Sequence, residues 1–130
     1  MFEAEYLIFC RQIQMSPAGT NLLGIFELVR ALKFPMAFPH MQAQVKLRVK
    51  KPIYGEDLKA KIIIELDNKV VSQTNTVLKD AKAIKNQCIP INVDFPDLIF
   101  GEAGDYFFKF YLNDRLLITR LLQVDLDHEE

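Results

Sequence analysis

The sequence is poor in the residues from which small enzymes and disulfide scaffolds are built. Its 130 residues include no tryptophan, two cysteines and two histidines. Two cysteines are too few for a disulfide framework, and because both lie in apolar runs, we expect Cys10 and Cys88 to be buried free thiols. Nothing in the sequence brings His40 or His128 to a nucleophile, so we expect no enzyme and no catalytic residues.

Targeting signals and nucleotide motifs are also missing. Acidic Glu3 and Glu5 stand where a signal peptide needs basic residues, and no apolar run reaches the length of a membrane span. The five glycines form no phosphate-binding loop, and a net charge of -1 selects neither nucleic acid nor anionic lipid. We therefore expect a cytoplasmic protein with no cofactor, no bound metal and no membrane partner.

The sequence does contain apolar residues that alternate with a period of two. In Gln42–Lys50 every second residue is apolar, from Ala43 to Val49, and the residues between them are glutamine, lysine or arginine. The segments Ile89–Phe95 and Asp105–Asn113 repeat this alternation. Such a pattern is typical of strands that have one face in a core and the other face in water.

Other segments extend this all-β pattern. Polar turns centred on Asn68 and Asn113–Asp114 predict two hairpins. The apolar spacing of Leu22–Leu32 suits an amphipathic helix as well as a strand, but its β-branched and aromatic residues favour a strand. Asp80–Asn86 is expected to be a short helical turn or a loop. The further expected strands are Ala4–Gln14, Lys59–Asp67, Val70–Lys79 and Leu116–Leu126.

These strands predict an all-β, antiparallel two-sheet sandwich of about seven to nine strands. The chain contains no internal repeat and no linker that would divide it. We expect a single domain over residues 1–124 and an acidic C-terminal tail over residues 125–130.

The segment that begins at Gly104 resembles the tyrosine corner of immunoglobulin-like sandwiches. In such a corner the ring of Tyr106 would pack in the core while its hydroxyl binds backbone, and Gly104 would permit the close approach. Because the chain has no tryptophan and its cysteines are not at immunoglobulin positions, we expect an immunoglobulin-like fold that is not a true immunoglobulin domain.

Several segments together resemble an uncharacterised family of small bacterial proteins, a domain of unknown function. The resemblance covers nearly the full length and implies a sandwich fold and a bacterial or phage-related cytoplasmic setting. It implies no activity. The segments that carry it are Cys10, Gly24–Phe26, Phe34-Pro35 with Phe38-Pro39, Val45–Val49 and Gly104–Tyr106.

Basic residues occupy the expected outward faces of two predicted strands. Lys46, Arg48 and Lys50 alternate along one strand, and Lys59 and Lys61 along the next. If these strands are neighbours, the five side chains form a basic patch that could bind phosphates or an acidic partner. No aromatic residue interleaves the patch, as binding of single-stranded nucleic acid would require. Binding of a small ligand or of nucleic acid through this basic patch is the alternative function.

The last predicted hairpin carries aromatic residues on both faces. Phe107, Lys109 and Tyr111 would lie on the outward face, and large exposed aromatics indicate a surface that something covers. The cover is either the Phe34–Phe38 loop or another protomer. We expect a non-catalytic protein-interaction or structural module that uses a sheet face or edge, with a protein partner or a second copy as its ligand.

Acidic residues gather in the connection Asp94–Asp105. Asp94, Asp97, Glu102 and Asp105 lie close in sequence, and several carboxylates at one end of a sandwich can bind calcium. Their spacing matches no calcium loop, and acidic loops are commonly just solvated. We assign no metal ligands here.

Overall fold

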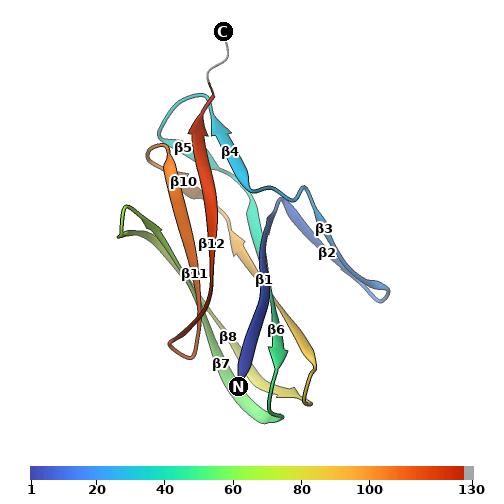
Figure 1. Cartoon of the computed structure of the whole chain (residues 1–130). Helices are drawn as coiled ribbons and strands as arrows, with labels where there is room; N and C mark the ends of the chain where they lie inside the picture. The colour runs from blue at the N-terminus through green and yellow to red at the C-terminus, as the bar shows by residue number, and fades with distance from the viewer. Residues whose placement is uncertain (128–130) are drawn as a thin grey trace.

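The computed structural model describes residues 1–127, which consist of strands and the turns between them (Figure 1). Within this range there is no helix, so the all-β prediction is confirmed. Both hairpins predicted at Asn68 and Asn113 are present. The strands are β1 Phe2–Cys10, β2 Gln12–Ser16, β3 Gly19–Leu23, β4 Leu28–Ala31, β5 Met36–Phe38, β6 Met41–Val49, β7 Ile53–Leu66, β8 Lys69–Ala83, β9 Cys88–Phe95, β10 Leu98–Phe100, β11 Gly104–Leu112 and β12 Arg115–Leu126.

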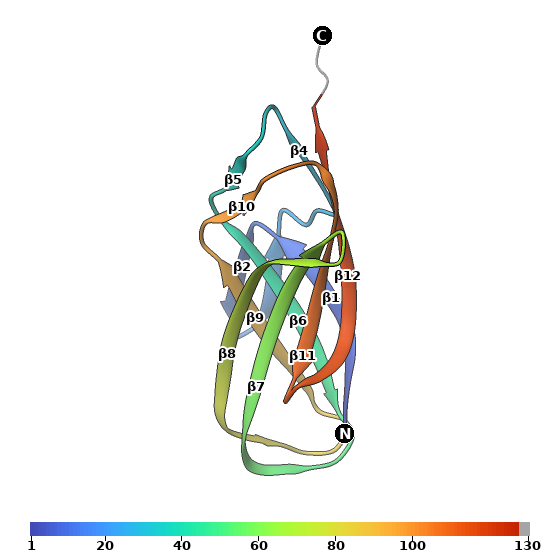
Figure 2. The same cartoon turned by 90° about the vertical axis from the view of Figure 1, so that its left-hand side faces the viewer.

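Eight of these strands form two larger sheets (Figures 1 and 2). One sheet has the order β4-β12-β11-β7-β8, and the other has the order β1-β6-β9. Every pair in these sheets is antiparallel except β12 with β4, which is parallel. The prediction of a purely antiparallel arrangement is wrong at this edge, because the chain enters β4 from the β2–β3 ribbon rather than through a hairpin from β12.

The other four strands make two short ribbons, β2–β3 and β5–β10. The β2–β3 ribbon projects from the body of the molecule, as Figure 1 shows. With the four strands of these ribbons the chain has more strands than the predicted seven to nine, because the residues of the ribbons were predicted to belong to longer strands and to loops. Leu22–Leu32 is divided at Gly24, whose φ of 68° turns the chain away from the ribbon.

The core lies between the two larger sheets and is built around the ring of Phe108 on β11. Its centroid lies 4.7 Å from that of Phe9 on β1 and 5.7 Å from that of Phe95 on β9, both in edge-to-face geometry. Phe26 stacks on Phe9, and Phe38 stacks on Phe26, which extends the aromatic contacts to one end of the core. Edge-to-face and offset aromatic pairs add about 0.5–1.5 kcal/mol each beyond the burial of their area.

Strand bounds differ from the predictions around β7 and β8. β7 begins at Ile53, before the start of the predicted strand Lys59–Asp67, and β8 continues to Ala83, through most of the segment Asp80–Asn86. Asp80 has a φ of 52° and lies at an irregularity in the β7–β8 register. This irregularity accommodates one extra residue of β8 without ending the strand. At the C-terminus, β12 extends to Leu126, which overlaps the predicted tail by two residues, and residues 128–130 lie outside the described range.

The outward face of β6 is less exposed than its alternation predicts. Gln44 is buried, because it accepts a hydrogen bond from the Tyr6 hydroxyl (2.6 Å) and donates one to Asn92 Oδ1 (3.0 Å). The ribbon adds cover, since the Ile13 N–H donates to Gln42 Oε1 at 2.7 Å. The outward face of β6 is therefore half-buried and hydrogen-bonded, whereas the alternation predicts a solvated face.

The two cysteines are both unpaired, but only one is buried. Cys10 lies in the core region, and burial raises the pKa of its thiol. Cys88 is half-buried, so the prediction of burial is wrong for it. Its side chain shares the outward face of β9 with Pro90 and Asn92, opposite Arg48 in the register.

The start of β11 has the geometry of a tyrosine corner. Tyr106 is buried, and its hydroxyl donates a hydrogen bond of 2.7 Å to the carbonyl oxygen of Glu102. Its ring meets that of Phe100 edge to face, and burial raises the pKa of the phenol. Gly104 has a φ of 155°, and a Cβ there would lie 2.8 Å from Leu66 Cδ1.

We predict that this corner contributes measurably to stability. Tyr106→Phe should lower the free energy of unfolding by about 1 kcal/mol, because it removes the part-buried hydrogen bond from the Tyr106 hydroxyl to the carbonyl oxygen of Glu102. Gly104→Ala should cost about 1–3 kcal/mol, because an alanine is strained at that φ. Urea unfolding followed by circular dichroism measures both.

Gly101→Ala is the matched control, because a Cβ at Gly101 meets no heavy atom within 4 Å. It should change the free energy of unfolding by no more than about 0.5 kcal/mol. Equal losses for Gly101→Ala and Gly104→Ala would contradict the role assigned to the corner.

Candidate interaction site at the edge of the five-stranded sheet

Strand β8 forms one edge of the five-stranded sheet, and its far side pairs with no strand of residues 1–127. It is 15 residues long and mostly exposed. From Ser72 to Leu78 its register with β7 is regular, so this part is a strand without bulges that has unpaired N–H and C=O groups along its open side.

The middle of β8 lacks the features that protect most edges. Between Lys69 and Lys79 the sequence Val70–Leu78 has no charged residue, no proline and no glycine. Natural edges are usually blunted by lysine, proline, bulges or shortness, because an open strand recruits other strands. The nine-residue uncharged stretch therefore leaves the edge of β8 available for pairing with another strand.

The other edges of the two larger sheets are protected. β4 is only four residues long, and β9 carries Pro90, which cannot donate to a further strand. β1 has an irregularity between Ala4 and Tyr6 and lies against β12. Of these four edges, β8 alone combines length, regularity and exposure.

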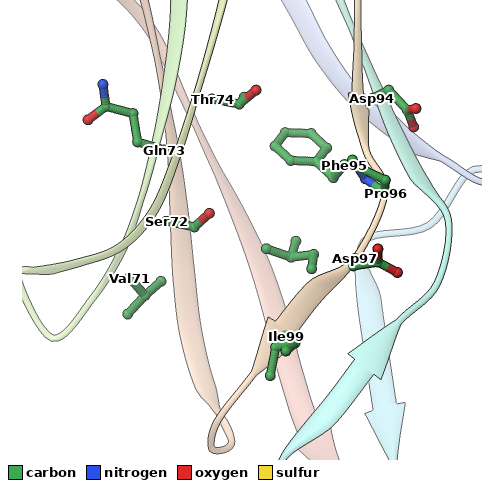
Figure 3. Close-up of a pocket in the computed structure, with 10 residues that line it drawn as sticks. Val71, Ser72, Gln73, Thr74, Asp94, Phe95, Pro96, Asp97 and Ile99 are labelled. Atoms are coloured by element: carbon green, nitrogen blue, oxygen red, sulfur yellow. The ribbon is translucent and has the colours of Figure 1, made fainter.

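A groove of about 410 Å³ runs between β8 and the β9–β10 connection (Figure 3). On one side stand Ser72 and Thr74, whose partners on β7 are the buried residues Ile64 and Ile62. On the other side the ring of Phe95 points into the gap toward β8, as Figure 3 shows, and Leu98 also lines the groove. The groove thus has an apolar floor beneath a row of hydroxyl groups.

Two carboxylates border the same groove. Asp94 and Asp97 line it, and within the described residues neither forms an ion pair. Of the other acidic residues predicted as a group, Glu102 lines a neighbouring hollow beside Tyr106. In the part of the chain that the structure describes, no three acidic, histidine or cysteine side chains gather as metal ligands would.

The predicted face of the last hairpin lies on the outer side of the five-stranded sheet. Phe107 is 41% exposed and stands opposite Leu121, which is equally exposed. Lys109 pairs with Glu65 at 3.1 Å, and Lys61 Nζ lies 5.2 Å from the centre of the Tyr111 ring. The Phe34–Phe38 loop does not cover this face, because β5 pairs with β10 and Phe38 is buried against Phe26.

The five residues of the predicted basic patch are not brought together. Lys46, Arg48 and Lys50 belong to β6 and its end in the three-stranded sheet, whereas Lys59 and Lys61 belong to β7 in the five-stranded sheet. The two strands are not neighbours, so the condition for a continuous patch is not met.

Acidic residues also offset this charge locally. Glu5 lies 2.9 Å from Arg48 and 3.4 Å from Lys46, and Glu3 lies 2.8 Å from Lys50. Lys61 has Asp114 at 3.8 Å. Sequence reasoning missed these pairs, because Glu3 and Glu5 are more than forty positions from their partners along the chain.

Sequence reasoning also missed the β8 edge and its groove. The signal was present in the uncharged run Val70–Leu78, which was interpreted only as half of a hairpin. Which side of that hairpin stays open depends on strand order, and a single sequence does not reveal strand order.

One family model, described as "Family of unknown function (DUF6941)", matches residues 5–125. The match confirms the expected membership of a family of unknown function and adds no activity. No curated protein matches the sequence. Residues 1–127 contain no helix long and apolar enough to span a lipid bilayer.

The ion pair between Glu5 and Arg48 predicts a pH effect. The hydrogen bond and charge of Arg48 lower the pKa of the Glu5 carboxyl below its ordinary value. A depressed carboxyl pKa stabilises the fold above the unfolded-state pKa, and this contribution is lost as the pH falls through the folded-state pKa. Arg48→Gln should therefore raise the Glu5 pKa, and an NMR titration of its side-chain carboxyl carbon measures this change.

Lys50→Gln serves as the control, because Lys50 pairs with Glu3 and not with Glu5. It should leave the Glu5 titration in place. A Glu5 pKa that is the same in the wild type and in Arg48→Gln would show that the pair does not form in solution.

Proposed function

We propose that this chain, which belongs to the DUF6941 family of unknown function, is a non-catalytic protein-interaction module that binds an extended partner strand along the open edge of β8. The observation that carries the proposal is the uncharged stretch Val70–Leu78, whose register with β7 is regular from Ser72 to Leu78. An incoming strand would continue the five-stranded sheet at the side where β8 has no neighbour.

Backbone hydrogen bonds would supply the main binding energy. Strand addition uses the N–H and C=O groups of an exposed edge, and pockets for alternate side chains add specificity. The regular register of Ser72–Leu78 supports this mode, because an edge without bulges presents its N–H and C=O groups in the unbroken alternation that a ladder of hydrogen bonds requires.

The groove would then select side chains of the partner strand. Every second side chain of an added strand would lie on the groove side, beside the hydroxyl groups of Ser72 and Thr74, which favours small or β-branched side chains at those positions. The unpaired carboxylates of Asp94 and Asp97 at the rim favour a basic residue nearby. This arrangement fits a peptide segment better than a compact small molecule.

The architecture supports an immunoglobulin-like sandwich as the setting for this edge. Two facing sheets share the core around Phe108, and the hydrogen bond from Tyr106 to Glu102 matches a tyrosine corner. We propose a cytoplasmic setting, supported by the two unpaired cysteines Cys10 and Cys88. The alternative of phosphate or nucleic-acid binding has weaker support, because the basic residues divide between two sheets.

A photo-cross-linking residue at Gln73 tests the use of the edge. Gln73 is exposed on β8, so in cells that naturally produce the protein we expect it to form adducts with the bound partner. The same residue at Phe107 reports on the face of the last hairpin, and at Gln14 it reports on the exposed ribbon. Adducts are resolved by mass and identified by peptide sequencing.

We expect the Gln73 adducts to exceed the Gln14 adducts at least severalfold and to fall severalfold when Asn75→Lys is added, because a lysine blunts an edge. Adducts from Phe107 in the absence of adducts from Gln73 would move the interaction to the sheet face. Gln73 adducts that persist unchanged with Asn75→Lys would count against strand addition.

A further inference from the structure

We infer that the partner strand at the β8 edge is β8 of a second copy of this chain, paired antiparallel about a two-fold axis at Thr74. This inference rests on the proposed use of the edge and specifies its occupant. The pairing would join two five-stranded sheets into one continuous sheet.

The sequence of the edge is chemically symmetric about Thr74. An antiparallel two-fold at this residue places Ser72 opposite Thr76 and Gln73 opposite Asn75 of the other copy. Further out, Val71 meets Val77, and Val70 meets Leu78. Hydroxyl therefore faces hydroxyl and amide faces amide over Ser72–Thr76, where the register of β8 with β7 is regular, and the aliphatic pairs lie beyond this part, next to the irregularity at Val71.

Neighbouring registers lack this match. A two-fold axis at Gln73 would place Asn75 opposite Val71 and Thr76 opposite Val70. An axis at Asn75 would place Gln73 opposite Val77 and Ser72 opposite Leu78. Both alternatives set polar side chains against aliphatic ones, so cross-strand pairing favours the axis at Thr74.

The two faces of the edge are consistent with the same axis. Ser72, Thr74 and Thr76 stand opposite buried residues of β7, so their hydroxyls would form a ladder above the groove. Gln73 and Asn75 stand opposite Ile63 and Lys61, so the amides would pair on the outer face. Cross-strand threonine and serine pairs, like paired amides, can form side-chain hydrogen bonds.

Charge and strand geometry limit the pairing to this stretch. No like charges meet between Val70 and Leu78, whereas Lys69 and Lys79 would meet just beyond it. The register irregularities of β8 lie at Val71 and at Asp80, so the regular part that is symmetric about Thr74 is Ser72–Thr76. A short pairing of this kind buries little surface, so we expect a reversible dimer that dissociates on dilution.

Sedimentation of the purified full chain at increasing concentration tests the inference. The wild type should shift from the mass of one chain to that of two. Q73K/N75K should remain monomeric, because the lysine at position 73 of each copy would face the lysine at position 75 of the other. Q14K/N21K is the matched control, since Gln14 and Asn21 are an exposed cross-strand amide pair on the β2–β3 ribbon, and this variant should dimerise like the wild type.

Charge complementation then tests the register. Q73D/N75D should also be monomeric alone, but an equimolar mixture with Q73K/N75K should form a heterodimer, because each lysine faces an aspartate. Circular dichroism checks that all variants retain the strand signal. In a Cys88→Ser background and with oxidised glutathione added as the oxidant, Thr74→Cys should form an intermolecular disulfide, since Thr74 faces itself on the axis, whereas Val77→Cys should not.

The outcomes separate this inference from the proposed function. A wild type that stays monomeric at all concentrations, or a dimer that Q73K/N75K leaves intact, overturns self-pairing through β8. Loss of the dimer in Q73K/N75K without recovery in the mixture overturns the axis at Thr74. If self-pairing fails while Gln73 cross-links to a different protein in cells, the edge remains the interaction site and only its occupant changes.

Discussion

The ring of Phe108 contacts both outer strands of the three-stranded sheet, through Phe9 on β1 and Phe95 on β9. Because Phe108 lies on β11, the middle strand of the five-stranded sheet, this contact is made at the centre of the wider sheet. Two strands of the wider sheet then lie beyond β11 on each side. The exposure of β8 is thus a consequence of how the core is centred.

The two sides of the five-stranded sheet, beyond β11 in each direction, are packed differently. On the side of β12 and β4, β1 lies close to β12, and Phe26 bridges to Phe9 and stacks on Phe38. On the side of β8 the corresponding space is the groove lined by Thr74, Phe95 and Leu98. The same aromatic packing that closes one side therefore leaves the other as an edge with an apolar floor.

Sequence alternation predicted those elements whose geometry depends on local residues. The buried rows of β6, β9 and β11 follow from a period of two, and the two hairpins follow from Asp67–Asn68 and Asn113–Asp114, which adopt positive φ. Long-range placement was not accessible in this way. Gln44 alternates like a solvent-facing residue, yet Tyr6 and Asn92 bury it, and Lys46 and Lys61 belong to different sheets.

The stretch Val70–Leu78 carries no charge, although most of its residues are exposed. Exposed residues of a solvated edge gain from charge, as Lys69, Lys79 and Lys82 illustrate on the same strand, yet the nine residues between the first two carry none. An edge open to any strand would endanger solubility unless its pairing were selective. Symmetry of side-chain type about Thr74 provides that selectivity, because the matched classes meet only in one register, while the flanking lysines oppose extension beyond it.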